Sequence, residues 1–320
     1  MVTNYKMRRK WFFTLFVFIL LISMLFLSGC ISRREEFVYN GEKRTYILDL
    51  PTTYDSSKTY PLVIVFHGGG GNAKSIRDVT NFSLKAEEED FIVLYPDGSG
   101  KLDRKLLSWN CGFCCGYALE NNIDDIGFIR ELIEYLQEQY SIDESMIYAT
   151  GLSNGGIMSY YVGAALSDIF AAVAPVAAQI GGQASEQEIL WHVPEPAYPV
   201  SVLAINGMND SRVPYDGGQP ENNDTKVYSW MSTNESILFW VEQNQCDSFP
   251  ERNVSKSGNI IIDTYHGGLN GTEVQLISIV NGNHSWPGGK KGWDQGDNPT
   301  KEINATDVIW DFFKTHPKNS

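Results

Sequence analysis

A serine lies between two glycines in the segment Gly-Leu-Ser-Asn-Gly at residues 151–155. The spacing Gly-x-Ser-x-Gly is typical of a sharp turn between a strand and a helix, which exposes the serine hydroxyl as a nucleophile above a sheet. The flanking residues fit this context, because residues 146–150 predict a strand and residues 155–166 predict a helix. The N-terminus of that helix would face a developing negative charge. The segment therefore predicts a nucleophile at Ser153 in preference to a plain glycine turn.

A glycine run supplies candidate donors for an oxyanion. His67 follows the apolar stretch 62–66 and precedes four glycines, 68–71. A phosphate-binding loop would need Gly-Lys-Ser/Thr at the end of this run, and Gly-Asn-Ala is present instead. A flexible glycine loop is the other interpretation. Beside a nucleophile, however, we expect the N–H groups of Gly68 or Gly69 and of Asn154 to form an oxyanion hole.

An acid and a base are expected after the serine, in the chain order serine, acid, histidine. His284 lies four residues past the predicted strand 274–280. Asp210 follows the predicted strand 200–205. The other histidines either precede the serine or the acid, end a short strand, or lie in the C-terminal tail. We therefore expect His284 as the base and Asp210 as the acid. The alternatives for the acid are Asp216 and Asp224.

These residue types together predict acyl transfer without a metal ion or an organic cofactor. The imidazole would take the serine proton as the hydroxyl attacks an ester carbonyl, and the carboxylate would hold the imidazole. Backbone donors would stabilise the tetrahedral oxyanion, and water would then release the acyl group.

The elements that must position these residues alternate along the chain. Strands alternating with helices predict an α/β fold with a mostly parallel central sheet and helices on both faces. Parallel sheets gather their sites at the carboxyl ends of the strands, where all the candidates lie. The predicted strands are a hairpin at 37–50 and residues 62–66, 91–95, 146–150, 170–177, 200–205, 260–265 and 274–280. The predicted helices are 75–90, 123–136 with Asn121 or Asn122 as its cap, 155–166, 235–243 and 305–313, while 179–199 reads as irregular.

Residues 1–29 have the order of a secretory signal, with a basic start, an apolar run at 11–27 and a small pair before Cys30. A cysteine directly after a small pair predicts lipidation of Cys30, a tether at 30–36 and a single domain at 37–320. An uncleaved membrane anchor is the alternative, although a run of 17 residues is short for a bilayer. Full secretion is a third reading. We expect an extracytoplasmic domain that meets the membrane through its anchor alone.

Charge and cysteine content narrow the partners and the compartment. The formal net charge of −14 argues against a nucleic-acid partner, since an acidic surface repels phosphates. Four cysteines remain besides Cys30, an even number that suits an oxidising compartment. Adjacent Cys114 and Cys115 would strain a mutual bond, so we expect a bridge from this loop, through Cys115, to Cys246. A zinc site at Cys111, Cys114 and Cys115 is the alternative.

The chain resembles extracellular esterases that group poly(3-hydroxybutyrate) depolymerase-like proteins with feruloyl and acetylxylan esterases, known as carbohydrate esterase family 1. The resemblance runs from about residue 44 to residue 313 and implies an α/β-hydrolase fold. It carries the roles of serine, acid and histidine onto Ser153, Asp210 and His284. It departs at Asn206, where the family often has histidine, and at Cys111, where a small residue is common. The matching segments are 67–71, 95–98, 109–110, 114–116, 124–129, 148–156 and 282–288.

The resemblance implies a small or oligomeric ester as the substrate, either a feruloyl or acetyl ester of polysaccharide fragments or a hydroxybutyrate-type oligomer. Trp109 and Trp286, with Trp293, lie in predicted loops, where they either stack on substrate rings or pack those loops. A serine peptidase, a short-chain lipase and a non-catalytic binding lipoprotein are the competing functions. The peptidase would usually carry a propeller or a large cap domain, and the lipase an apolar lid.

Overall fold

The computed structural model describes residues 34–102, 104–221 and 226–319, so Cys30, the signal segment and Asp224 lie outside the described residues. Arg34–Ser320 forms one compact unit. Its first element is a hairpin of β1 (Arg34–Tyr39) and β2 (Glu42–Asp49), as the sequence predicts. The tether expected at 30–36 is wrong at its end, because Arg34 already pairs with Ile47 in the sheet.

The described residues contain a ten-stranded sheet with the order β1-β2-β4-β3-β5-β6-β9-β13-β12-β11. Neighbours from β4 to β13 run parallel, and antiparallel pairs occur at the two edges, which confirms the mostly parallel sheet. A small second sheet has the order β10-β7-β8. The remaining strands are β3 (Tyr60–Phe66), β4 (Ile92–Pro96), β5 (Ile142–Leu152), β6 (Ala172–Val176), β7 (Gly181–Gln183), β8 (Trp191–His192), β9 (Ser201–Gly207), β10 (Ser229–Trp230), β11 (Glu251–Val254), β12 (Ile260–Tyr265) and β13 (Val274–Ile279).

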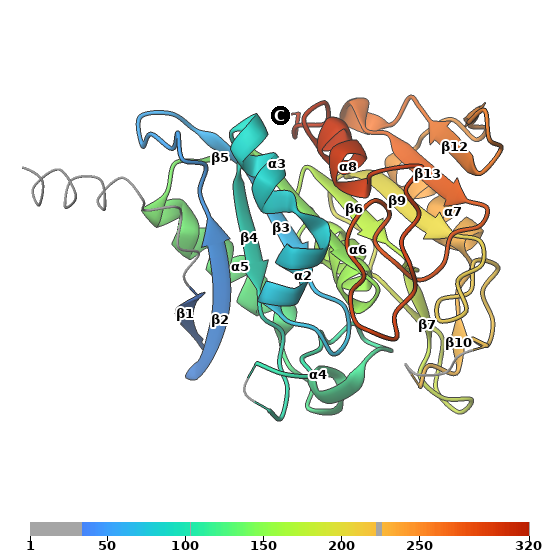
Figure 1. Ribbon diagram of the computed structural model, residues 1–320, viewed down its shortest axis with the longest axis horizontal. Helices are drawn as coiled ribbons and strands as arrows, with labels where there is room; N and C mark the ends of the chain where they lie inside the picture. Colours follow the sequence, from blue (N-terminus) through green and yellow to red (C-terminus); the bar gives the residue numbers. More distant parts are fainter. Residues whose placement is uncertain (1–33, 103, 222–225, 320) are drawn as a thin grey trace, which may run out of the picture. The chain divides into compact units, whose positions relative to one another are not determined.

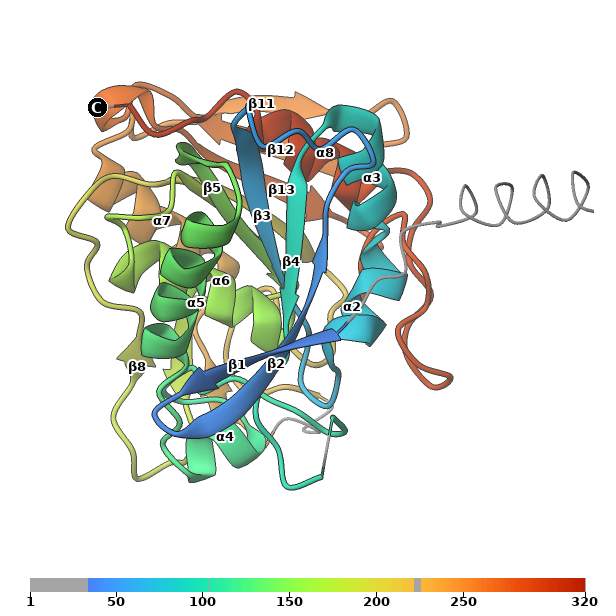
Figure 2. The same ribbon diagram turned by 90° about the vertical axis from the view of Figure 1, so that its left-hand side faces the viewer.

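Helices cover both faces of the large sheet (Figures 1 and 2). Alternate strand residues point to opposite faces, so Leu62 and Ile64 join one apolar core while Val63 and Val65 join the other. The first core contains α5, α6 and α7, and the second contains α2, α3 and α8. The bounds are α2 (Ala73–Thr80), α3 (Phe82–Glu89), α4 (Gly116–Glu120), α5 (Asp125–Gln139), α6 (Asn154–Ala165), α7 (Thr233–Asn244), the short 3-10 helix η1 (Leu269–Gly271) and α8 (Ala305–Phe313).

Three local details differ from the sequence predictions. The single helix expected at 75–90 is two helices, because Asn81 adopts a left-handed conformation with φ 57° between α2 and α3. Asp124, not Asn121 or Asn122, caps α5 by accepting the Gly127 N–H. The irregular stretch 179–199 contains the short strands β7 and β8. Across the residues that the structure describes, no helix has the length and apolar character needed to span a bilayer.

The register of the parallel strands brings their carboxyl ends to one edge. Phe66 pairs with Gly151 and Leu152 pairs with Val176, so β3, β5 and β6 end together. On the other side of β6, Gly207 at the end of β9 pairs with Ile279 at the end of β13. The four loops that follow β3, β5, β9 and β13 therefore share this edge, and they carry the residues that the sequence singled out.

Candidate active site

Ser153 occupies a strained turn between β5 and α6. Its φ of 58° and ψ of −122° place an L-residue in a region normally reserved for glycine, and its N–H donates to the Val176 carbonyl at 2.9 Å. Glycines flank it because a side chain at Gly151 would collide with the Gly155 carbonyl, and one at Gly155 with the Phe66 carbonyl. The turn has the geometry that Gly-x-Ser-x-Gly predicts, with the serine directly before the helix.

His284 and Asp210 form a buried pair. The imidazole Nδ1 lies 2.7 Å from Asp210 Oδ2, and the two residues are only 3% and 6% exposed. The other carboxylate oxygen, Oδ1, accepts the N–H groups of Arg212 and Val213, each at 2.9 Å. These bonds orient the carboxylate so that it accepts a hydrogen bond from Nδ1–H, which leaves Nε2 of the neutral ring as the basic nitrogen. The alternative acid Asp216 is exposed.

Ser153 and His284 line the same cavity, which has a volume of about 580 Å³. The structure contains no hydrogen bond between the Ser153 hydroxyl and the imidazole. Asp210 thus has its expected partner, and the Ser153 hydroxyl shares the cavity with the imidazole. In enzymes without bound substrate such contacts are often long and tighten in the reactive complex.

The glycine loop after β3 lies against the turn at Ser153. A side chain at Gly68 would lie 3.5 Å from the Ser153 Cβ, and one at Gly69 would lie 3.8 Å from the Asn154 Cβ. The later glycines use their amides inside the structure, since Gly70 donates to Leu107 at 2.8 Å and Gly71 to Gly68 at 3.0 Å. The amides of Gly68 and Gly69 remain the candidates for an oxyanion, beside that of Asn154, whose N–H has no partner within α6.

The buried side chain of His67 supports this loop through two hydrogen bonds. Its Nδ1 donates to the Gly68 carbonyl at 2.8 Å, and its Nε2 accepts the Gly98 N–H at 2.9 Å. Burial lowers the pKa of His67 to about 4, against the opposing effect of the Gly68 carbonyl and Asp97. The neutral ring is therefore the form that joins β3 and β4 at the strand ends.

The depressed pKa predicts a stability loss in acid. Because the folded pKa of about 4 lies below the ordinary value of 6.5, His67 favours the folded state above pH 6.5, and this contribution disappears as the pH falls through 4. The shift corresponds to roughly 3 kcal/mol of unfolding free energy. Urea unfolding between pH 7 and pH 4 should therefore show a smaller acid loss in His67→Asn, which cannot be protonated, than in the unmodified protein. Equal losses in the two proteins would contradict this assignment.

Two of the three tryptophans expected near the substrate are buried elsewhere. Trp286 is 1% exposed, packs edge-on against Phe82 and donates to the Thr306 hydroxyl at 3.1 Å, so its assignment to substrate binding is wrong. Trp109 is 0% exposed and donates through its indole to the His67 carbonyl, so its assignment is wrong as well. Both side chains fill apolar space below the loops in which they lie.

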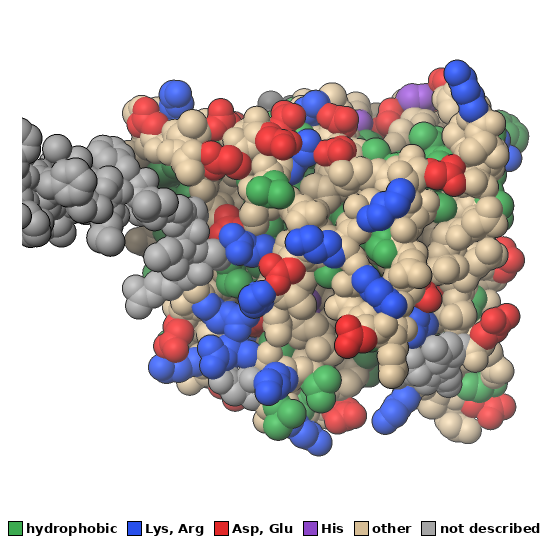
Figure 3. Space-filling model, in the orientation of Figure 1, with side chains coloured by type: hydrophobic (Ala, Val, Ile, Leu, Met, Phe, Trp, Pro, Cys, Tyr) green, Lys and Arg blue, Asp and Glu red, His purple; other side chains and the backbone are tan. Residues whose placement is uncertain are grey.

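Trp293 does reach the cavity. It is 46% exposed, and the Arg212 guanidinium lies 5.2 Å from its ring centre while pairing with Asp297 at 3.1 Å. Besides His284, the described lining of the cavity includes the cationic Arg212 and Lys226 and the acidic Glu120, although the chain as a whole is acidic. On the face seen in Figure 3, acidic side chains gather towards the top and most Lys and Arg side chains lie lower. The aromatic and charged lining residues are Phe113, Tyr117, Glu120, Arg212, Lys226 and Trp293.

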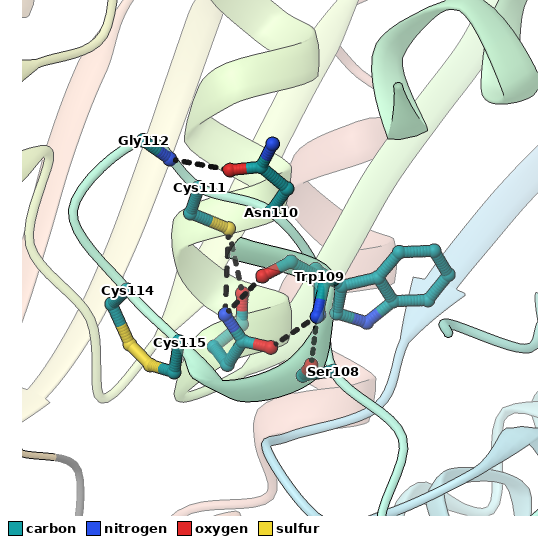
Figure 4. Close-up of a disulfide and its surroundings, with 9 residues drawn as sticks. Ser108, Trp109, Asn110, Cys111, Gly112, Cys114 and Cys115 are labelled. Carbon is teal, nitrogen blue, oxygen red and sulfur yellow. Dashed lines mark hydrogen bonds between the residues drawn. A yellow bond between two sulfur atoms is a disulfide. The ribbon is translucent and has the colours of Figure 1, made fainter. Parts of the chain in front are cut away.

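The cysteine pairing differs from the expectation. Cys114 is bonded to Cys115 (Figure 4), and Cys246 is free and half-buried, so the bridge between Cys115 and Cys246 is wrong. Cys115 and Cys246 lie at opposite ends of the parallel strands. Cys115 lines the cavity at their carboxyl ends, whereas Cys246 contacts the N–H of Val274, at the start of β13. Among the described residues, no group of three or more His, Cys, Asp or Glu side chains is placed to hold a metal ion.

A buried ion pair that the sequence did not reveal supports the loop after β4. Arg44 Nη2 lies 2.7 Å from Asp125 Oδ1, and Asp125 Oδ2 accepts the Asn110 N–H at 2.8 Å. Burial raises the pKa of Asp125, and Arg44 opposes that effect. Asp124 thus caps helix α5, whereas Asp125 supports the loop after β4 from inside the protein. Only the fold could distinguish them, since both begin the same helix.

The chain is similar to known esterases in sequence and in fold. Residues 44–189 match the family described as Esterase PHB depolymerase. The chain is 30% identical to feruloyl esterase B of Piromyces equi over 252 residues, which cover 78% of this chain. It is 28% identical to the probable feruloyl esterase C of Aspergillus terreus over 300 residues, 89% of this chain and 90% of that protein. Residues 44–189 thus carry an Esterase PHB depolymerase domain, and the chain is similar to feruloyl esterases over most of its length.

These similarities leave the activity of the whole protein to be proposed, because the chain spans only 44% of the Piromyces equi enzyme. Solved structures support the fold. An acetyl xylan esterase from Aspergillus awamori aligns over 88% of this chain and 99% of its own with a TM-score of 0.58 at 14% identity. The structure of the protein pOPH aligns over 92% and 90% with a TM-score of 0.56 at 14% identity. These likenesses confirm the α/β-hydrolase fold.

Proposed function

We propose that this protein is an extracytoplasmic serine hydrolase of carboxylic esters that works through an acyl-enzyme. The observation that carries the proposal is the buried pair of His284 and Asp210 at the same cavity as the strained Ser153. Nε2 of the oriented ring accepts the serine proton while Oγ attacks the ester carbonyl, and the imidazolium then protonates the departing alcohol. Water, deprotonated by the same imidazole, then attacks the acyl-enzyme. The imidazolium returns the proton to Ser153 Oγ, and the carboxylic acid leaves.

The oxyanion of each tetrahedral intermediate would lie between two chain segments. The N–H of Asn154 is on the nucleophile side, and those of Gly68 and Gly69 are on the loop after β3. Removing one such donor typically costs about 10²–10³ in rate. The N-terminal end of α6 adds a favourable dipole at the same place.

The cavity has room for acyl groups that are larger than acetyl, such as those with a ring or a longer chain. Its volume of about 580 Å³ and its aromatic lining by Phe113, Tyr117 and Trp293 suit a hydroxycinnamoyl group or a sugar ring. The feruloyl esterases among the relatives point to the same class. We therefore propose feruloyl or acetyl esters of polysaccharide fragments, or hydroxybutyrate-type oligomers, as substrates, with Trp293 as a stacking surface.

A panel of esters tests this function. We expect hydrolysis of p-nitrophenyl acetate, p-nitrophenyl butyrate and methyl ferulate, and we would compare these with acetate release from acetylated xylan. In Trp293→Ala, kcat/KM for methyl ferulate should fall about 10-fold more than kcat/KM for p-nitrophenyl acetate, because only the larger acyl group reaches the indole. A complete lack of hydrolysis across the panel would favour a peptidase or a binding function instead.

The anchor is a proposal of its own, because Cys30 lies outside the described residues. The order of basic, apolar and small residues before Cys30 supports a lipoprotein that holds the esterase at the outer face of the membrane. A labelled fatty acid should be incorporated into the full chain and not into Cys30→Ala. Equal labelling of both proteins would exclude Cys30 as the attachment site.

A further inference from the structure

Trp109 connects the two segments that carry the candidate oxyanion donors. It lies 42 residues after His67 and 45 residues before Asn154 in the chain. All three residues are buried, with exposures of 0% for Trp109 and His67 and 2% for Asn154. Figure 4 shows Trp109 on the strand-end loop that also bears Cys111 and the Cys114–Cys115 bond.

The first connection joins Trp109 to the nucleophile turn. Its backbone N–H donates to Asn154 Oδ1 at 2.8 Å, and its carbonyl accepts from Asn154 Nδ2 at 3.1 Å. The side-chain amide of Asn154 thus pairs with the main chain of Trp109 in two directions. Because side chain and backbone belong to one residue, this pairing also restrains the N–H of Asn154.

The second connection joins the same residue to the glycine loop. The indole Nε1 donates to the His67 carbonyl at 3.0 Å, and the indole lies beside the imidazole with ring centres 5.0 Å apart. The peptide bond that starts at this carbonyl ends at the N–H of Gly68. The His67 ring in turn holds the Gly68 carbonyl, so the peptide units on both sides of Gly68 are restrained.

We propose that Trp109 is a positioning residue, which sets the spacing between the Asn154 amide and the Gly68–Gly69 amides before substrate binds. This inference rests on the proposed acyl-transfer function for the identity of the oxyanion. It assigns Trp109 a role below the cavity in place of substrate contact. The physical reason is that an oxyanion hole stabilises charge only if its donors need no reorganisation during the reaction, and displacements near 1 Å cost on the order of 10² in rate.

The test is Trp109→Phe, which keeps an aromatic ring and removes the indole donor. We expect kcat for p-nitrophenyl acetate to fall about 10–100-fold while KM stays within about 2-fold, since the oxyanion forms only in the transition state. Affinity for a phenylboronic acid, which forms a tetrahedral adduct with the serine, should fall by a similar factor. Active-site titration would correct both values for the folded, reactive fraction.

Trp310→Phe is the matched control. Trp310, in α8, is also buried at 4% exposure and stacks on Phe91, and its indole nitrogen makes no hydrogen bond. It therefore controls for lost bulk without loss of a hydrogen bond. Boronate affinity and kcat in this variant should stay within about 2-fold of the unmodified protein.

Asn154→Ala tests the other connection without adding a charge. It keeps the backbone N–H and removes both hydrogen bonds to the Trp109 main chain, so we expect the same split between kcat and KM. The double variant with Trp109→Phe should lose less than the product of the two single effects, because both changes release the same pair of amides. Strict multiplication of the effects would show that the two connections act independently, contrary to the proposal.

The outcomes separate this inference from the function on which it rests. If Trp109→Phe binds boronate and turns over ester as Trp310→Phe does, positioning by Trp109 is overturned while esterase activity stands. If the unmodified protein binds boronate but hydrolyses no ester, the substrate class fails, and boronate affinity still decides the role of Trp109. If it neither binds boronate nor hydrolyses esters, both proposals fall.

Discussion

Replacing Ser153 with alanine is expected to lower kcat for p-nitrophenyl acetate by at least about 10⁴-fold, since the acyl-enzyme cannot form without the hydroxyl. The backbone should tolerate the change, because the strain of φ 58° is already present with serine. A fluorophosphonate should add one label to the unmodified protein and none to the variant. Stopped-flow or long-incubation assays would measure the residual rate.

Ser159→Ala is the matched control for this variant. Ser159 lies in α6, the helix that follows Ser153, is buried, and donates to the Gly155 carbonyl at 2.8 Å. Its loss should affect stability more than turnover, with kcat within a few-fold of the unmodified value. Substantial hydrolysis by Ser153→Ala, or labelling of that variant, would place the nucleophile elsewhere and remove the basis of the proposed mechanism.

Replacing Asp210 with asparagine is expected to reduce kcat by about 10³–10⁴-fold. The reason lies in the 2.7 Å contact between Asp210 and His284: an amide in that place can donate to Nδ1 and favour the wrong tautomer, which leaves Nε2 protonated and unable to act as a base. Substrate affinity should change little, because Asp210 is absent from the cavity lining. The measurement is kcat and KM at several pH values, since the loss should diminish in strong base.

Asp216→Asn and Asp224→Asn are the controls, because the sequence left these two residues as alternative acids. Asp216 is exposed, so its variant should retain nearly full activity. Asp224 lies outside the described residues, and the activity of Asp224→Asn in the same assay shows directly whether this residue acts as the acid. Loss of activity in either variant with retention in Asp210→Asn would reassign the acid.

The buried tryptophans show that a residue can lie in a loop beside the site, as the sequence predicts, without contacting the substrate. Trp109 and Trp286 stand in loops that border the site, and loop position alone left two roles open, stacking on a substrate ring or packing of the loop. In the structure each indole turns inward, and each N–H has a partner, the His67 carbonyl for one and the Thr306 hydroxyl for the other. Trp293 is held at the cavity by Arg212 instead. Residue type predicts that an aromatic ring is useful, but burial depends on what the rest of the chain packs against it.

The cysteines make a similar point. Neither their number nor their spacing could place Cys246, because its position follows from where α7 ends relative to β13. The bond between Cys114 and Cys115 instead lies in the loop that borders the cavity. The pairing of distant residues is a property of the assembled sheet, which local sequence does not contain.

The sequence by itself determined the sharp turn at Ser153, the alternation of strands and helices, and the order in which Ser153, Asp210 and His284 follow their strands. These are local properties. Glycine is required at 151 and 155 because a side chain there would collide with backbone atoms, and the apolar runs form strands that are buried on both faces. Only the tertiary structure decided which carboxylate meets the imidazole, which tryptophan reaches the cavity, and that Trp109 ties Asn154 to His67. Those outcomes depend on the register of parallel strands and on packing between segments more than 40 residues apart, as the separations of 42 and 45 residues at Trp109 illustrate.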